Sequence, residues 1–95
     1  MSTNKNDAKK AMVLTALQAV RDAFQNEPSS PSVTRALDQC DRLELAISQF
    51  HAEGLRFAAF TLLRMVNSHG TAFTEPVRSA TQNLKNALEM AGYPH

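Results

Sequence analysis

The residues best able to do chemistry in this 95-residue chain are His51 and Glu53, which stand two positions apart. Histidine can act as a base, a metal ligand or a phosphoryl acceptor near neutral pH. A helical pair of metal ligands needs side chains three or four positions apart, because a spacing of two directs them away from each other. The spacing therefore favours a solvated helix end, at which the histidine meets the negative pole of a helix.

A phosphoryl-acceptor role for His51 is the first alternative. Residues 51–56 (HAEGLR), within a chain of predicted helices, resemble the region around the phosphoryl-accepting histidine of histidine phosphotransfer domains. That family has a lysine three positions after the histidine and a patch of small residues beyond it. Here Gly54 takes the lysine position, and Leu55 and Phe57 occupy the small-residue region. The resemblance covers six residues and implies a phosphoryl carrier that uses His51.

A helix-turn-helix around Gly54 is the second alternative, since a glycine suits the turn between two such helices. The helix before this turn is net acidic, however, and the net charge of the whole chain is only +1. The helix after the turn offers few polar side chains for a DNA groove, namely Arg56, Thr61, Arg64 and Asn67. These features disfavour a nucleic-acid partner.

No residue pattern in the sequence predicts catalysis, a cofactor or a metal site. Cys40 lies on an apolar seam between Leu37 and Leu43, with no histidine at helical spacing, so we expect a buried structural thiol. The charged face of the same segment mixes both signs, with Arg35, Asp38, Asp41, Arg42 and Glu44. That mixture indicates a solvated ion-pair face rather than a carboxylate metal site. We therefore predict a protein that is not an enzyme.

A surface for a protein partner is predicted by Phe57, Phe60 and Arg64, which follow one line of a helix at spacings of three and four. Arg56 lies beside them. Aromatic residues and arginine are enriched where interfaces concentrate their binding energy. The alternative is that the first and last helices of the same chain cover both phenylalanines and make them core. We predict that this surface binds a second copy or another protein, and that the chain forms a homodimer.

Helices must position these residues, because apolar side chains recur at three- and four-residue spacing along most of the chain. The most apolar helix lies within residues 54–70, and the clearest break is residues 27–31, which contain two prolines. Ser30 or Ser32 suits the start of the second helix, and Thr74 that of the fourth. The predicted helices span residues 7–26, 32–53, 55–69 and 75–91.

The predicted fold is all-α, a compact four-helix bundle-like domain over residues 7–92, preceded by a flexible N-terminus over residues 1–6. Gly92 ends the last helix. A straight helix through Gly54 would turn the apolar faces before and after it apart by about a quarter turn. We therefore expect a break or a sharp kink near Gly54, which can serve as the C′ residue. The acidic second helix and the arginine-bearing third helix have charges that suit neighbours.

Composition places the protein among globular chains, because 43% of its residues are hydrophobic. No apolar run approaches the roughly 20 residues of a membrane helix, and the single cysteine cannot form an internal disulfide. We therefore expect a cytoplasmic protein that does not bind membranes. The predicted function is a small helical module for protein–protein interaction or regulation, which self-associates.

Overall fold

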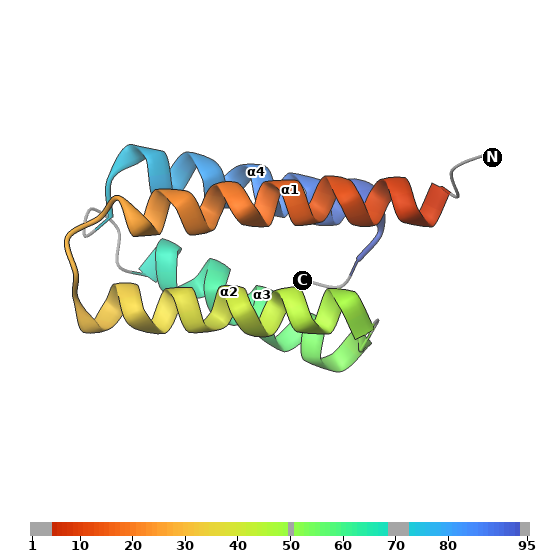
Figure 1. Cartoon of the computed structure of the whole chain (residues 1–95), viewed down its shortest axis with the longest axis horizontal. Coiled ribbons are helices and arrows are strands. Elements are labelled where there is room, and N and C mark those ends of the chain that lie inside the picture. The colour runs from red at the N-terminus through yellow and green to blue at the C-terminus, as the bar shows by residue number, and fades with distance from the viewer. Residues whose placement is uncertain (1–4, 50, 69–72, 94–95) are drawn as a thin grey trace.

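Four helices run back and forth along one long axis in the computed structural model, which describes residues 5–49, 51–68 and 73–93 (Figure 1). They are α1 (Lys5–Gln25), α2 (Pro31–Gln49), α3 (Ala52–Ser68) and α4 (Glu75–Ala91). Each helix is antiparallel to the next, and the described residues contain no strand. The predicted all-α four-helix fold is confirmed. α1 begins two residues earlier than predicted, so residues 5 and 6 of the predicted flexible N-terminus are helical. Residues 1–4 and His69, the predicted end of the third helix, lie outside the described residues.

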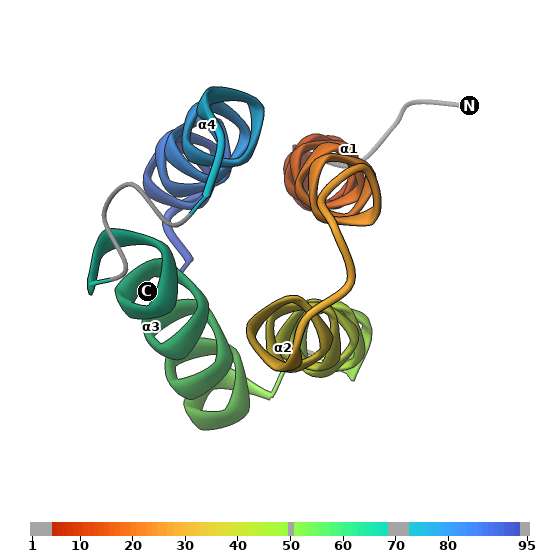
Figure 2. The same ribbon diagram turned by 90° about the vertical axis from the view of Figure 1, so that its left-hand side faces the viewer.

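The helices pack as two close pairs. α1 packs most extensively against α4, and α2 against α3, whereas α3 and α4 share the smallest of the four helix contacts around the ring. Figure 2 shows α1 and α3 at opposite corners of this ring, with α3 inclined to the other helices. One side of α3 therefore faces the interior, and the other faces away from the bundle.

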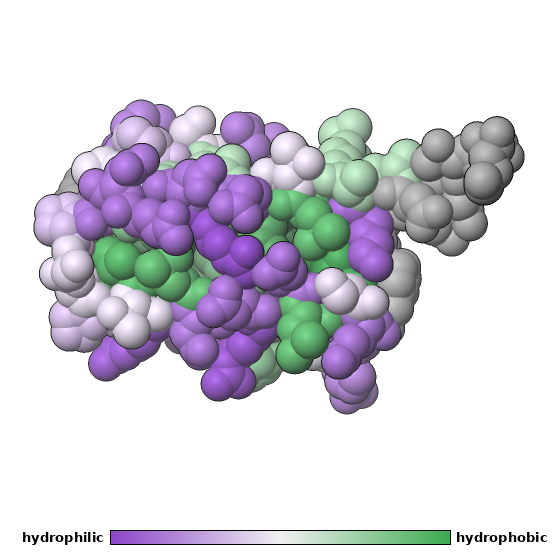
Figure 3. Space-filling view, in the orientation of Figure 1, coloured by the Kyte–Doolittle hydropathy of each residue, from purple (hydrophilic) through white to green (hydrophobic). Residues whose placement is uncertain are grey.

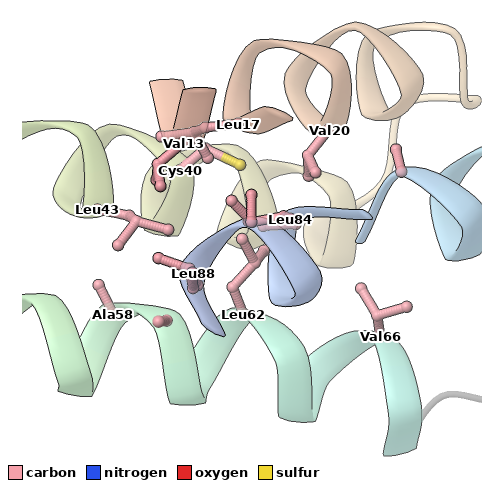
Figure 4. Close-up of a cluster of buried hydrophobic side chains, with 14 of the residues drawn as sticks. Val13, Leu17, Val20, Cys40, Leu43, Ala58, Leu62, Val66, Leu84 and Leu88 are labelled. Carbon is pink, nitrogen blue, oxygen red and sulfur yellow. The ribbon is translucent and has the colours of Figure 1, made fainter. Parts of the chain in front are cut away.

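One apolar core joins all four helices (Figure 4). Its side chains come from the helical stripes that the sequence predicts. The buried residues labelled in Figure 4 are Val13, Leu17 and Val20 of α1, Cys40 and Leu43 of α2, Ala58, Leu62 and Val66 of α3, and Leu84 and Leu88 of α4. Each buried leucine or valine contributes about 1.5–3 kcal/mol, so this core is the main source of stability.

Local interactions set the helix ends. At the start of α2, Ser30 Oγ accepts a hydrogen bond from the Val33 N–H (3.1 Å), so Ser30 is the cap. Gly92 ends α4, as predicted, and has a left-handed φ of 73°. Thr74 occupies the N-cap position of α4, but its side chain does not cap the helix. Its hydroxyl and its N–H both donate to Glu27 Oε1, at 2.6 Å and 2.8 Å, which ties the α1–α2 linker to α4.

The break between α2 and α3 lies at His51, and the prediction that Gly54 ends α2 is wrong. α2 ends at Gln49 and α3 begins at Ala52, so Gly54 lies in the first turn of α3. The cause is a side-chain cap: His51 Nδ1 accepts a hydrogen bond from the Gly54 N–H (3.0 Å). The side chain thus meets the positive pole of α3 instead of the predicted negative pole. A Cβ at position 54 would lie 2.9 Å from Nδ1, so glycine leaves room for the cap.

Charged side chains connect α1 to α2. Arg21 of α1 donates to Asp41 Oδ1 (2.9 Å) and to Glu44 Oε2 (2.6 Å) of α2. The hydrogen bond to Glu44 and the two carboxylate charges raise the pKa of Arg21 above its ordinary value. Arg42 pairs with Asp38 within α2 (2.8 Å), as the spacing suggests. Among the described residues no ion pair joins α2 to α3. The charges of these two helices are complementary, as the sequence predicts, but they do not form direct ion pairs with each other.

Candidate interaction surface

The outer face of α3 exposes two neighbouring phenylalanines. Phe57 is 67% exposed and Phe60 is 53% exposed, although both belong to a helix whose other face is buried. Helical geometry is the cause, because Leu55, Ala58 and Leu62 point into the core and the two rings project from the opposite side. These exposures exclude the alternative in which other helices of the same chain bury both rings as core.

Three open hollows follow one another along this face. The first is bounded by Glu53, Arg56, Phe57 and Phe60. The second is bounded by Phe57, Phe60, Thr61, Arg64, Met65 and Ser68. The third is bounded by Phe60, Leu63, Arg64, Asn67, Ser68 and, from α4, Lys85. We name the line Glu53–Phe57–Phe60–Arg64 the outer seam; its two phenylalanines form walls shared by neighbouring hollows.

Charges of opposite sign stand at the two ends of the outer seam. Glu53 is exposed in the first turn of α3, and Arg64 is exposed towards its end. Arg56 is also exposed, and Lys85 adds a cation beside Arg64. None of these four side chains makes an ion pair with another described residue. No described residue therefore neutralises these charges by direct pairing.

The apolar surface extends onto α2 through Leu45, which the sequence reasoning did not single out. Leu45 is 57% exposed and borders the same hollow as Phe57. The sequence could have indicated Leu45, because it is a large apolar residue that does not belong to the buried stripe of α2. Its position beside Phe57, however, depends on how α2 packs on α3. The face formed by α1 and α2 is, by contrast, mostly hydrophilic with separate apolar patches (Figure 3).

His51 lies at the edge of this surface, in the hollow that Leu45 and Phe57 also border. It is exposed, but its Nδ1 is engaged as the cap of α3. The described residues contain no group of three or more His, Cys, Asp or Glu side chains placed to hold a metal ion. The geometry thus gives His51 a structural task and adds no observation that favours phosphoryl transfer.

The polar residues proposed for a DNA groove share α3 with the two exposed rings. Thr61 donates its hydroxyl to the Phe57 carbonyl (2.7 Å), which occupies its donor within the helix. α3 returns antiparallel along α2 (Figure 1). No feature of this arrangement favours a recognition helix over a protein-binding face.

Cys40 of α2 is fully buried in the core, as expected for a structural thiol. Burial raises the pKa of its thiol to about 12, and the nearby Arg21 offsets only part of that rise. The thiolate that cysteine chemistry needs is therefore strongly disfavoured at neutral pH.

None of the helices in the described part of the chain is long and apolar enough to cross a membrane. Comparison with known proteins finds no matching family model, curated protein or solved structure.

Proposed function

We propose that this protein is a small helical interaction module that self-associates through the outer face of α3. The observation that carries the proposal is the exposure of Phe57 and Phe60 on a helix whose inner face is already buried. Folding of one chain leaves both rings in water, so their burial remains available to drive association.

The energy available from these rings is enough for a weak dimer. An aromatic side chain buries about 150–250 Å², and apolar burial contributes about 25 cal/mol per Å². Since the rings are partly buried in the monomer, their complete burial in both chains would contribute on the order of 10 kcal/mol. The loss of translational and rotational freedom opposes this by about 4–15 kcal/mol. At the low end of this cost about 6 kcal/mol remains, so we expect a dissociation constant of roughly tens of micromolar or above.

The charged residues around the rings supply direction and selectivity. Rim charges speed encounter and disfavour wrong partners more than they add affinity. The proposal assigns no catalytic step, cofactor or metal to the chain. It places the protein in the cytoplasm, where the reducing environment suits its single, buried thiol, Cys40.

The test is the molar mass of the variant that carries both Phe57→Ala and Phe60→Ala. Light scattering from about 10 μM to about 1 mM covers the expected affinity range. The wild-type mass should rise towards that of a dimer, and the variant should stay monomeric with an unchanged helical circular dichroism spectrum. Met90→Ala is the matched control, because Met90 is 72% exposed on α4 but borders none of the three hollows along the outer seam.

Two results would contradict the proposal. A wild-type protein that stays monomeric over the whole concentration range would exclude self-association. A double variant that unfolds would show that the rings stabilise the monomer, against their exposure in the structure.

A further inference from the structure

We propose that the partner on the outer face is the α3 helix of a second copy, packed antiparallel about a two-fold axis that passes between Phe57 and Phe60. This inference rests on the proposed self-association and adds the direction and the register in which the two α3 helices pack. Three features of α3 carry it: the spacing of the outer seam, the arrangement of its hollows, and the order of its charges.

The outer seam has the spacing of a helix–helix interface. Glu53, Phe57, Phe60 and Arg64 follow one another at intervals of four, three and four residues, and all four are exposed. Intervals of this kind keep side chains aligned along one face towards a second helix. α3 thus carries two faces, one packed on its own bundle and one with the pattern of a second contact.

The hollows along the seam match those that a packed helix fills. In such packing, a side chain of one helix inserts between four residues of the other, and the diamond on a helix surface is formed by residues i, i+3, i+4 and i+7. The three hollows contain the sets 53, 56, 57, 60, then 57, 60, 61, 64, and then 60, 63, 64, 67. Each set has that pattern, so side chains of a second helix can enter consecutive hollows.

Burial of the seam would leave few polar groups without partners. Thr61, which borders the middle hollow, already donates its hydroxyl to the Phe57 carbonyl (2.7 Å). Arg56, Asn67, Ser68 and Lys85 border the hollows beside the seam, and the outer seam itself carries only the charges of Glu53 and Arg64. Each charge therefore needs a partner of opposite sign if a second helix covers the seam.

The order of the charges selects the antiparallel direction. With the two-fold axis midway between the rings, Phe57 faces Phe60 of the partner subunit, and Glu53 faces Arg64 of the partner subunit. The Glu53 and Arg64 positions are about 16 Å apart along the helix at 1.5 Å per residue, so one ion pair closes each end of the aromatic centre. A parallel pair would instead oppose two glutamates at one end and two arginines at the other, and like charges repel.

Charge reversal tests this direction. Glu53→Arg and Arg64→Glu each replace two attractive contacts by two repulsive ones, whereas the combined variant restores both contacts in reversed order. We expect each single reversal to raise the dimer dissociation constant about tenfold or more. The combined variant should return to within about threefold of the wild-type value.

Sedimentation equilibrium measures these constants, and circular dichroism checks that each variant is folded. Lys9→Glu is the matched control, because it makes the same change of charge as Arg64→Glu at an exposed position on α1, at the opposite corner of the bundle (Figure 2). Glu53→Gln and Arg64→Gln are milder variants that remove one charge without repulsion. They should weaken the dimer by a smaller factor, and they keep the test valid if a reversal disturbs folding.

The possible outcomes separate this inference from the proposed function. Single reversals that dimerise like the wild type, or a combined variant that does not recover, would overturn the antiparallel pairing. In that case the self-association proposal still stands if the Phe57→Ala, Phe60→Ala variant is monomeric. A monomeric wild type would instead contradict the proposed function itself.

Discussion

Phe24 and Phe73 meet at one end of the bundle with almost no exposed surface, whereas Phe57 and Phe60 lie side by side on α3 in water. The buried pair is 0% and 3% exposed, with ring centroids 5.3 Å apart and ring planes at 87°. The exposed pair is 67% and 53% exposed. Phe24 and Phe73 are far apart in the chain and bury each other, whereas Phe57 and Phe60 are close in the chain and remain exposed. Burial therefore depends on the face of the helix that carries a residue and on what packs against that face.

The two pairs differ in what surrounds them. Phe24 continues the buried stripe of α1. Phe73 directly precedes Thr74, the N-cap residue of α4, which donates two hydrogen bonds to Glu27. An edge-to-face aromatic pair adds about 0.5–1.5 kcal/mol to the effect of burial. We conclude that the first pair stabilises the single chain. The second pair is exposed and therefore buries little surface in the single chain.

The largest effect should follow from truncation of the buried pair. Phe24→Ala leaves a cavity in the core, so we expect a loss of about 3–5 kcal/mol in the free energy of unfolding. That is a large part of the roughly 5–15 kcal/mol of a small domain. Urea unfolding followed by circular dichroism measures it. If this variant does not fold, Phe24→Leu provides a milder comparison. If Phe24→Ala lowers the free energy of unfolding no more than Phe57→Ala does, the two pairs do not differ in their contribution to stability.

A smaller effect is expected where α3 begins, close to the exposed pair. His51→Ala removes the cap on the Gly54 N–H and should lower the free energy of unfolding by about 1 kcal/mol. Gly54→Ala should gain helix propensity but displace His51, since its Cβ would lie 2.9 Å from Nδ1. Gly54→Ala should therefore stabilise the His51→Ala protein more than the wild type. Additive effects in this double-mutant cycle would contradict the cap.

Acid should lower the stability of the end of the bundle at which Phe24 and Phe73 meet. Hydrogen bonds from the hydroxyl and N–H of Thr74 lower the pKa of Glu27 below its ordinary 4.5. The stabilisation is therefore fully present above about pH 4.5 and is lost as the pH falls through the lower pKa of the folded state. The wild type should therefore unfold at a higher urea concentration than Glu27→Gln at about pH 6, and this difference should shrink as the pH falls to about 3. Thr74→Ser, which keeps the hydroxyl, should behave like the wild type.

The smallest effect is expected from the exposed pair on the stability of the monomer. At concentrations too low for dimers, Phe57→Ala and Phe60→Ala should each change the free energy of unfolding by no more than about 0.5 kcal/mol, as surface substitutions usually do. Urea unfolding at the lowest measurable concentration tests this. A loss of several kcal/mol would mean that the rings act as core and that the two pairs do not differ.

Much of the fold could be predicted from the sequence because it depends on local periodicity. The four helices, their buried stripes, the stop at Gly92 and the outward position of Phe57 and Phe60 all follow from three- and four-residue spacing. The sequence places the break at Gly54 because glycine is a common helix terminator, whereas α3 already begins at Ala52. The actual signal is a histidine three positions earlier, an uncommon choice of cap, so the pattern alone did not reveal it.

The sequence by itself determined which residues can share a helix face, and hence the core stripes and the outer seam. Only the tertiary structure decided which faces meet. It brought Arg21 to Asp41 and Glu44, Glu27 to Thr74, Phe24 to Phe73, and Leu45 to the side of Phe57. The physical reason is distance along the chain: helical geometry relates residues three or four positions apart. Contacts between residues 10 to 50 positions apart depend on how the helices pack, which no local pattern specifies.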